Sequence, residues 1–241
     1  MTFTDILPEG MPGEPLPYLL RTDGMITIIL FLCFILVSSV FSRGSKHLLQ
    51  GLKNFTQNRE RSNLFDEVTA ADARHTFFLV LHTCTMMGIC VYHYLSHTTP
   101  ILFQKFSRPL LFTELVAGIL LFIFIKWILY NAVNWVFFQK ARNIIWMASF
   151  FNLLIWFGIL LLPIVLLTVY FDISSETSFI LVAILLILAK MALFWKCFSN
   201  FFEKIYGVFH LILYFCALEI LPDLILWKGM EQITNILIFK L

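Results

Sequence analysis

The last apolar stretch of the chain, Gly207–Trp227, carries the residues whose types and spacing best fit a chemical role. Glu219 lies near the middle of this stretch, and Asp223 follows one helical turn later on the same face. Pro222 has no backbone N–H, so in a helix it leaves the carbonyl of Leu218 without its usual donor. A carboxyl group beside a free carbonyl in a low-dielectric medium can bind a proton, or coordinate a cationic or hydroxyl-bearing ligand.

A structural role for Glu219 is the competing interpretation, in which the carboxyl group is a hydrogen-bonded link between the last helix and a neighbour. The sequence favours this interpretation, because no basic residue is expected at the same depth. Lys190 is the nearest opposite charge along the chain. It is expected only about 9 Å of helical rise from the cytoplasmic end of its own span, so we expect its ammonium group to extend outward to the interface.

Two further ionisable residues are candidates for the same site. Glu114 enters the third apolar stretch close to the outer surface, and His93 lies in the second stretch. Pro163 is expected to break the fourth stretch at a depth similar to that of the kink at Pro222. We therefore predict that Glu114, His93, Glu219 and Asp223 line an outward-opening pocket beside two proline kinks.

Four histidines recur along the second apolar stretch. His75, His82, His93 and His97 return to nearly one helical face, a pattern that raises the possibility of haem or of a proton relay. Two haem sites with paired histidine ligands would need partners on other helices, and only His210 lies in another stretch. We therefore expect no cofactor and no metal, and we expect His82 and His93 to hydrogen-bond to facing helices.

The composition places these residues in a membrane rather than in water. Of the 241 residues, 60% are hydrophobic and 13% are charged, whereas a soluble domain carries about 25% charged residues. A soluble fold could not hide that much apolar surface. The net charge of +2 is too small to indicate nucleic-acid binding. The five cysteines form no C-x-x-C motif, and we interpret them as small buried hydrophobic residues.

Six apolar stretches have about the length that an α-helix needs to cross a bilayer, roughly 20 residues. Because lipid offers no water to satisfy open backbone groups, each is expected to be a helix. The predicted fold class is therefore an all-α polytopic transmembrane bundle of about six spans. The stretches are Met25–Phe41, Thr76–Leu95, Leu110–Trp127, Ile144–Tyr170, Ser178–Trp195 and Gly207–Trp227.

The basic residues predict how the bundle is oriented. Twelve of them, Lys126 and Lys190 included, fall between spans one and two, three and four, and five and six, and five fall on the other side. By the positive-inside rule both termini are expected outside the cytoplasm. The predicted organisation is a Pro-rich extracytoplasmic segment at 1–24, a membrane domain at 25–227 with a basic cytoplasmic loop at 42–75, and an extracytoplasmic tail at 228–241. Within the loop, the spacing of Leu48, Leu52 and Phe55 fits either an amphipathic helix on the membrane surface or a solvated connection.

Several motifs resemble a bacterial family of multi-pass membrane proteins of unknown function. The most distinctive is Leu218-Glu219-Ile220-Leu221-Pro222, and Asn134-Trp135-Val136-Phe137-Phe138 and Leu162-Pro163 are similar to that family too. Gly158, in the same span as Leu162-Pro163, would let a neighbouring helix approach closely. The resemblance implies a multi-pass protein of the inner membrane of a Gram-negative bacterium, and it implies no reaction, substrate or cofactor.

Two functions remain open at this point, and an enzymatic function ranks after both. The leading expectation is a non-enzymatic subunit or assembly factor of an envelope membrane complex, because a chain with almost no soluble part must bind partners through its helices or its first loop. Its expected partners are the lipid bilayer and either another membrane protein or a second copy of this chain, with no nucleic acid. The alternative is a small transporter or lipid-handling protein that works through Glu219 and Pro222.

Overall fold

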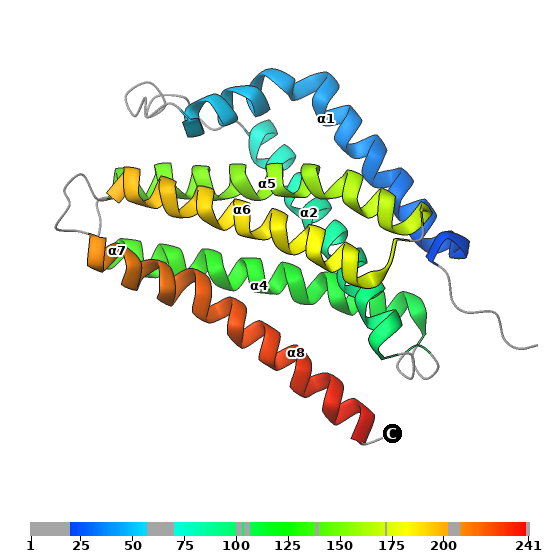
Figure 1. Cartoon of the computed structure of the whole chain (residues 1–241). Coiled ribbons are helices and arrows are strands. Elements are labelled where there is room, and N and C mark those ends of the chain that lie inside the picture. The colour runs from blue at the N-terminus through cyan, green and yellow to red at the C-terminus, as the bar shows by residue number, and fades with distance from the viewer. Residues whose placement is uncertain are drawn as a thin grey trace, which may run out of the picture.

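The computed structural model describes residues 20–56, 70–99, 103, 107–137, 140–171, 173–201 and 208–239. In this part of the chain the regular elements are all helices, and they lie side by side as a bundle (Figure 1). The elements are η1 (Leu20–Thr22), α1 (Gly24–Thr56), α2 (Ala70–Thr98), α4 (Arg108–Phe137), α5 (Lys140–Tyr170), α6 (Ser175–Phe201), α7 (Val208–Phe215), η3 (Cys216–Ile220) and α8 (Leu221–Phe239).

The helices confirm the predicted all-α membrane bundle. Five of them, α1, α2, α4, α5 and α6, contain segments long and apolar enough to cross a bilayer. The sixth predicted span is an unbroken helical path through α7, η3 and α8, in which η3 is a π-helical segment. The path continues to Phe239, so part of the predicted C-terminal tail is helical.

The first helix extends well beyond the predicted first span. Helix α1 continues to Thr56, and Figure 1 shows it bending so that its second half turns away from the line of the first. Most of the predicted loop at 42–75 is therefore helical on both sides of residues 57–69, which lie outside the described part. The side chains of Leu48, Leu52 and Phe55 also lie outside it, as do residues 1–19 of the N-terminal segment.

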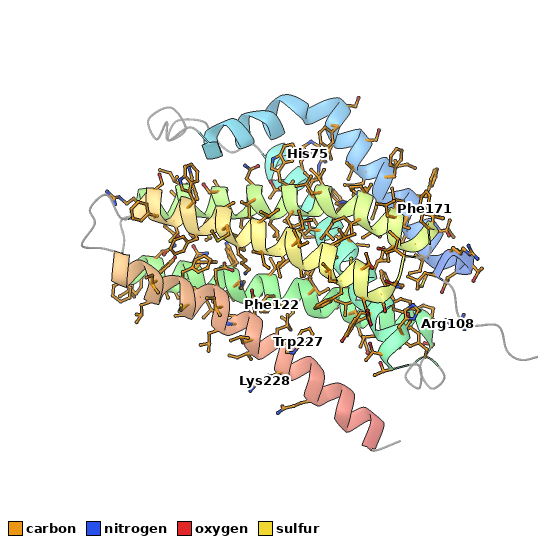
Figure 2. The ribbon with its side chains drawn as sticks, in the orientation of Figure 1. His75, Arg108, Phe122, Phe171, Trp227 and Lys228 are labelled. Carbon is orange, nitrogen blue, oxygen red and sulfur yellow. The ribbon has the colours of Figure 1, made fainter. Side chains whose placement is uncertain are left out.

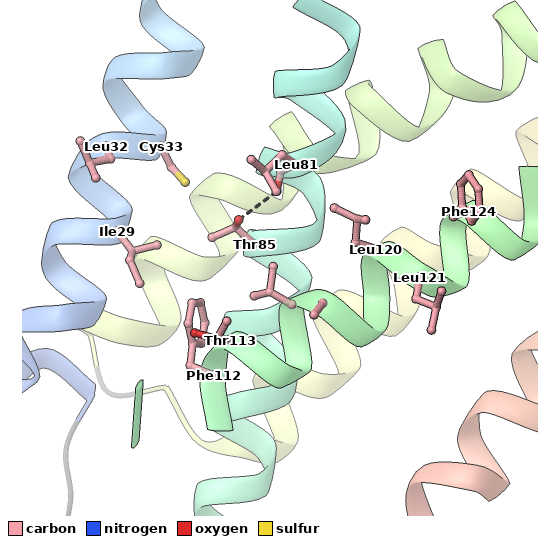
Figure 3. Close-up of a pocket in the computed structure, with 12 residues that line it drawn as sticks. Ile29, Leu32, Cys33, Leu81, Thr85, Phe112, Thr113, Leu120, Leu121 and Phe124 are labelled. Atoms are coloured by element: carbon pink, nitrogen blue, oxygen red, sulfur yellow. Dashed lines mark hydrogen bonds between the residues drawn. The ribbon is translucent and has the colours of Figure 1, made fainter. Parts of the chain in front are cut away.

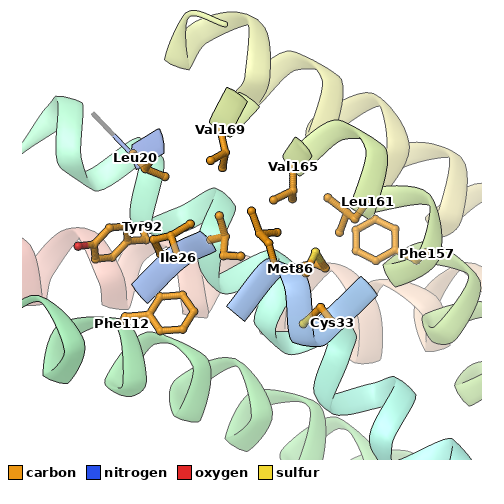
Figure 4. Packing of buried hydrophobic residues seen from close by; sticks show 12 residues of the cluster. Leu20, Ile26, Cys33, Met86, Tyr92, Phe112, Phe157, Leu161, Val165 and Val169 are labelled. Atoms are coloured by element: carbon orange, nitrogen blue, oxygen red, sulfur yellow. The ribbon is translucent and has the colours of Figure 1, made fainter. Parts of the chain in front are cut away.

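The centre of the bundle is the packing of α2 against α5, with α1 and α4 added at one end. Figure 4 shows Met86 and Tyr92 of α2 meeting Leu161 and Val165 of α5, with Phe112 of α4 beside them. These apolar side chains are almost completely buried. Their interdigitation supplies the dispersion contacts that drive helix association in lipid, where the hydrophobic effect between helices is absent.

A glycine allows the two central helices to approach. A Cβ atom placed on Gly158 of α5 would lie 2.0 Å from Oγ1 of Thr83 and 3.0 Å from its Cα in α2. The Thr83 hydroxyl donates to the carbonyls of Leu79 at 3.0 Å and of Leu154, across the interface, at 3.2 Å. The close approach predicted for Gly158 is confirmed. The predicted break at Pro163 is wrong, because α5 runs through this residue from Lys140 to Tyr170.

The outer surface of the bundle is apolar. Large hydrophobic side chains such as Phe31, Ile187 and Leu213 are more than half exposed. A water-soluble protein of this size does not leave so much apolar surface uncovered. The exposed surface therefore agrees with a bundle surrounded by hydrocarbon.

A candidate charge cluster inside the membrane bundle

Helix α4 reverses the usual arrangement of a soluble helix, because its buried residues are mainly polar. Its fully buried positions are Phe112, Lys126, Tyr130 and Asn134. The last three follow one another at steps of four residues, so they form a single stripe along the helix. The remaining faces of α4 are apolar and exposed. A helix in lipid gains from this arrangement, since its polar side chains find partners only inside the bundle.

Four ionisable side chains meet beside this stripe. Lys126 comes from α4, Lys190 from α6, Glu219 from η3 and Asp223 from the first turn of α8. Nζ of Lys126 lies 2.7 Å from Oε2 of Glu219 and 2.9 Å from Oδ1 of Asp223. Nζ of Lys190 contacts the same Glu219 oxygen and lies 2.7 Å from Oδ2 of Asp223. The hydroxyl of Tyr130 donates to the other oxygen of Glu219, Oε1. We call these four ionisable residues the charge cluster.

The charge cluster lies deep in the membrane. Lys126 and Lys190 are each eleven residues before the last residue of their helices, and Glu219 is eleven residues after the first residue of α7. At about 1.5 Å of rise per residue, each lies about 16 Å from the same end of the bundle. Helix α4 has 30 residues and is therefore about 45 Å long, close to the thickness of a bilayer with its headgroup regions. The cluster therefore lies inside the hydrocarbon core, nearer to this end of the bundle than to the other.

The four side chains differ in exposure. Glu219 is 1% exposed and Lys126 is 5% exposed, whereas Lys190 is 24% exposed and Asp223 is 34% exposed. The cluster therefore has a closed inner side at Glu219 and an open side at Asp223. Its two positive and two negative groups sum to zero charge. A neutral, fully paired set is the form in which charges are tolerated at low dielectric, whereas loss of one member leaves an unpaired charge.

A change of helical register places the two acids at the cluster. In η3 the N–H of Leu221 bonds to the carbonyl of Cys216, five residues earlier, so this turn is wider than an α-helical turn. Pro222 follows directly and cannot donate a backbone hydrogen bond. Prolines and π-bulges are both positions where helices bend, and π-bulges occur frequently at functional sites. The path of the last helix therefore changes at the residues that carry the carboxylates.

A second polar network continues the stripe of α4 toward the end of the bundle where α4 ends. The Tyr214 hydroxyl of α7 donates to Oδ1 of Asn134 at 2.8 Å, and Nδ2 of Asn134 donates to Oδ1 of Asn143 in α5, also at 2.8 Å. Nδ2 of Asn143 then donates to Oδ1 of Asn131 at 3.0 Å. Asn134 is fully buried, and its amide has partners on two other helices, whereas the neighbouring Trp135 is exposed.

The predicted site residues separate into two groups. Glu219 and Asp223 belong to the charge cluster, and Pro222 lies between them along the chain. Glu114 is exposed on α4, twelve residues before Lys126, and His93 is buried on α2, with its ring 4.8 Å from that of His97. In the described part of the chain, the ion pairs of Glu219 and Asp223 go to the two lysines instead.

Sequence reasoning missed the basic half of the cluster. It assigned Lys126 to the end of the third span and expected Lys190 to extend outward. The expectation for Lys190 is wrong, because its ammonium group contacts Glu219 and Asp223 instead of extending outward. Lys126 is buried against the same two acids, although α4 continues past it to Phe137. The signal for Lys126 was its spacing with Tyr130 and Asn134 in an apolar segment. For Lys190 the sequence offers no comparable signal.

The histidines of the predicted stripe have different surroundings. His82 is buried, and its ring interacts with the backbone of Gly158 on the facing helix α5. His97 is exposed at the end of α2. Within the described residues, no group of three or more His, Cys, Asp or Glu side chains is arranged to hold a metal ion.

An apolar groove lies on another face of the bundle. It runs between α1, α2 and α4, with Cys33, Phe112 and Phe124 among its lining residues (Figure 3). The hydroxyls of Thr85 and Thr113 face it, but each donates to a carbonyl of its own helix, at 2.9 and 2.8 Å. The groove therefore suits lipid chains and offers little for polar chemistry.

A bundle of apolar helices joined internally by buried ion pairs defines an integral membrane protein of the α-helical class. Within that class, the chain belongs to the family described as a domain of unknown function, DUF4271, whose model matches residues 26–230. The matched range includes every residue of the charge cluster. No curated protein and no solved structure matches the chain significantly.

Proposed function

We propose that the protein is a small proton-coupled membrane transporter in which the charge cluster binds and releases the proton. The observation that carries this proposal is the meeting of Lys126, Lys190, Glu219 and Asp223, from α4, α6 and the last helix, inside the apolar bundle. One neutral hydrogen bond would be enough to join two helices. Four charged groups at this depth are costly, and such residues mark ion and proton pathways in other membrane proteins.

The geometry supports a coupling between proton binding and helix movement. When Glu219 is ionised, it holds both lysines and accepts the Tyr130 hydroxyl. A proton added to Glu219 removes one negative charge, so one ammonium group loses its balancing charge in low dielectric. That penalty favours separation of α4, α6 and the last helix, and water or substrate can then reach the lysines. Proton binding to Glu219 and separation of the helices are in this way coupled, so the protein has a closed deprotonated state and an open protonated state.

The test is proton movement by the purified protein in liposomes. We expect proteoliposomes that contain a trapped pH dye to take up protons when a potassium diffusion potential is imposed. Glu219→Gln, which keeps the shape of the side chain but cannot ionise, should abolish the uptake while the protein remains folded. Glu114→Gln is the matched control, because it is the same substitution at an exposed position of α4 outside the cluster. Equal uptake by wild type and Glu219→Gln, or uptake no faster than in empty liposomes, contradicts the proposal.

The second candidate is the subunit or assembly factor of an envelope membrane complex. The observation that favours it is the course of α8, which diverges from the rest of the bundle toward its C-terminal end (Figure 1). Leu221, Leu224 and Ile225 on this helix are exposed. A transmembrane helix of another protein, or of a second copy of this chain, would cover such a surface. Mild detergent extraction followed by identification of stoichiometric co-purifying chains tests this role, which also requires Glu219→Gln to remain functional.

We further propose a bacterial inner-membrane location with both termini outside the cytoplasm. Because Lys126 and Lys196 are buried and Lys190 is drawn into the cluster, they do not contribute to the positive-inside bias, and the count becomes nine basic residues against five. The bias keeps its direction. Labelling of single introduced cysteines in intact cells tests it: a cysteine at Lys228 should react with an impermeant maleimide and a cysteine at Lys140 should not.

A further inference from the structure

The carboxylate of Asp223 bridges the two lysines with one oxygen for each. Oδ1 lies 2.9 Å from Nζ of Lys126, and Oδ2 lies 2.7 Å from Nζ of Lys190. This is the geometry that a carboxylate or phosphate group of a bound molecule would adopt between two ammonium groups. Here the oxyanion belongs to the chain itself.

The two acids of the cluster are held very differently. Glu219 is almost completely buried and has a third partner, the hydroxyl of Tyr130. Asp223 is one-third exposed, and it is the third residue of α8, the helix that diverges from the bundle (Figure 1). Asp223 can therefore leave the lysines by a movement of α8, whereas Glu219 remains to balance one of the two positive charges.

We infer that Lys126 and Lys190 form a binding site for an oxyanion, a carboxylate or a phosphate, and that Asp223 occupies this site until substrate displaces it. The inference rests on the proposed transport function and names the substrate class. When an external anion replaces Asp223, the site again contains two positive and two negative groups and stays neutral. The displaced Asp223 side chain lies on the exposed side of the cluster, where its carboxylate can reach polar surroundings.

The surroundings of the open side indicate an anion with an apolar tail. Ile187 and Met191 flank Lys190 on α6 and are more than half exposed, as are Leu224 and Ile225 beside Asp223 on α8. Figure 2 shows Trp227, one turn farther along α8 than Asp223, and Phe122, one turn before Lys126 on α4. An oxyanion head on the lysines would place its tail along these side chains, so the substrate is expected to be amphiphilic.

Direct binding to the purified protein in lipid nanodiscs tests the inference. The probes are decanoate and decyl phosphate, with decan-1-ol as the uncharged probe of the same chain length and empty nanodiscs as the background. We expect saturable binding of the two anions above that background, and none of the alcohol. Asp223→Asn should tighten anion binding at least tenfold, because it removes the competing carboxylate and leaves one lysine without a balancing charge.

A double variant provides a test that still applies if Asp223→Asn fails to fold. Lys190→Gln combined with Asp223→Asn keeps a neutral pair, Lys126 with Glu219, and should fold, yet it lacks one of the two anion ligands. We expect it to bind the anions at least tenfold more weakly than Asp223→Asn does.

Competition by acetate and inorganic phosphate shows whether the natural ligand is a soluble anion or a lipid-like one. Competition at concentrations similar to those of decanoate indicates a soluble anion, and much weaker competition indicates a lipid-like anion. Either result supports the site.

The inference is overturned if decan-1-ol binds as well as decanoate, or if Asp223→Asn and the double variant bind anions like the wild type. The anion-binding inference and the proposed proton coupling can fail independently, because anion binding is measured at constant pH without a proton gradient. Proton uptake that depends on Glu219, in a protein that binds no anion, overturns the substrate class alone. Anion binding without Glu219-dependent uptake overturns proton coupling alone.

Discussion

The two halves of the bundle are held together by different forces. Where α2 meets α5, the contact is close and mainly apolar, and Gly158 lies directly against Thr83. Where α4, α6 and the last helix meet, the contacts include ion pairs and hydrogen bonds, and α8 diverges beyond them. The first half depends on apolar packing, and the second half adds charge to an apolar cluster that includes Tyr130, Leu193 and Leu218.

This difference indicates which half can change its conformation. A close-packed apolar interface has one good arrangement, because a small displacement loses many contacts at once. An ion-pair cluster has at least two arrangements, since the addition of one proton or one anion alters the balance of charges. The scaffold of the protein is therefore expected to be α2 with α5, and the moving part to be α8.

The largest effect should follow from removal of the central acid. Glu219→Leu leaves Lys126 and Lys190 with only Asp223, so one positive charge is uncompensated inside the bundle. Loss of one partner from a buried pair costs about 3–5 kcal/mol. We expect a decrease of this size in the free energy of unfolding, measured by sodium dodecyl sulfate titration in bicelles. Glu114→Leu, at an exposed site, should change it by less than about 0.5 kcal/mol. Similar values for the two variants would show that the cluster does not stabilise the bundle.

A steric change in the other half should produce the next effect. Gly158→Leu places a side chain where Thr83 lies, so α2 and α5 must separate, at a cost of about 1–3 kcal/mol in the same assay. Gly118→Leu is the matched control, because a Cβ atom at Gly118 meets no atom within 4 Å. If both variants unfold like the wild type, the central interface is not close-packed.

Restoring neutrality should recover part of the lost stability. Lys126→Met leaves two acids with one lysine, and Glu219→Gln leaves two lysines with one acid. The double variant contains one of each, Lys190 and Asp223. We expect it to be more stable than the sum of the single effects predicts, by about 1–3 kcal/mol in a double-mutant cycle. Strict additivity would mean that the charges do not interact.

The smallest effect is expected in the asparagine network. Tyr214→Phe removes the hydroxyl that donates to Asn134 at 2.8 Å. Interhelical hydrogen bonds in membranes contribute about 0.6 kcal/mol on average. We expect a decrease of about that size, and little change in proton uptake, since the charge cluster stays intact. A complete loss of uptake in Tyr214→Phe would extend the functional site from the cluster into this network.

The sequence predicted the carboxylate half of the site but not the lysine half. Glu219 and Asp223 stood out because an acid deep in an apolar stretch is rare. Lys126 did not, because the third span was expected to end at Trp127, where a lysine is ordinary. The predicted neighbours Glu114 and His93 were chosen by depth alone, and depth says nothing about the direction in which a side chain points around its helix.

The membrane class and the apolar segment of each helix followed from the amino-acid sequence alone, because apolar length and composition are local properties of a segment. The ends of the helices did not, since α1 continues to Thr56 and α8 to Phe239. Which charges meet was decided only by the tertiary structure. Lys126 and Glu219 are 93 positions apart, and their contact depends on how far each helix extends, how it is rotated and where the π-helical turn shifts the register. Those quantities are set by packing between helices, which no single segment contains.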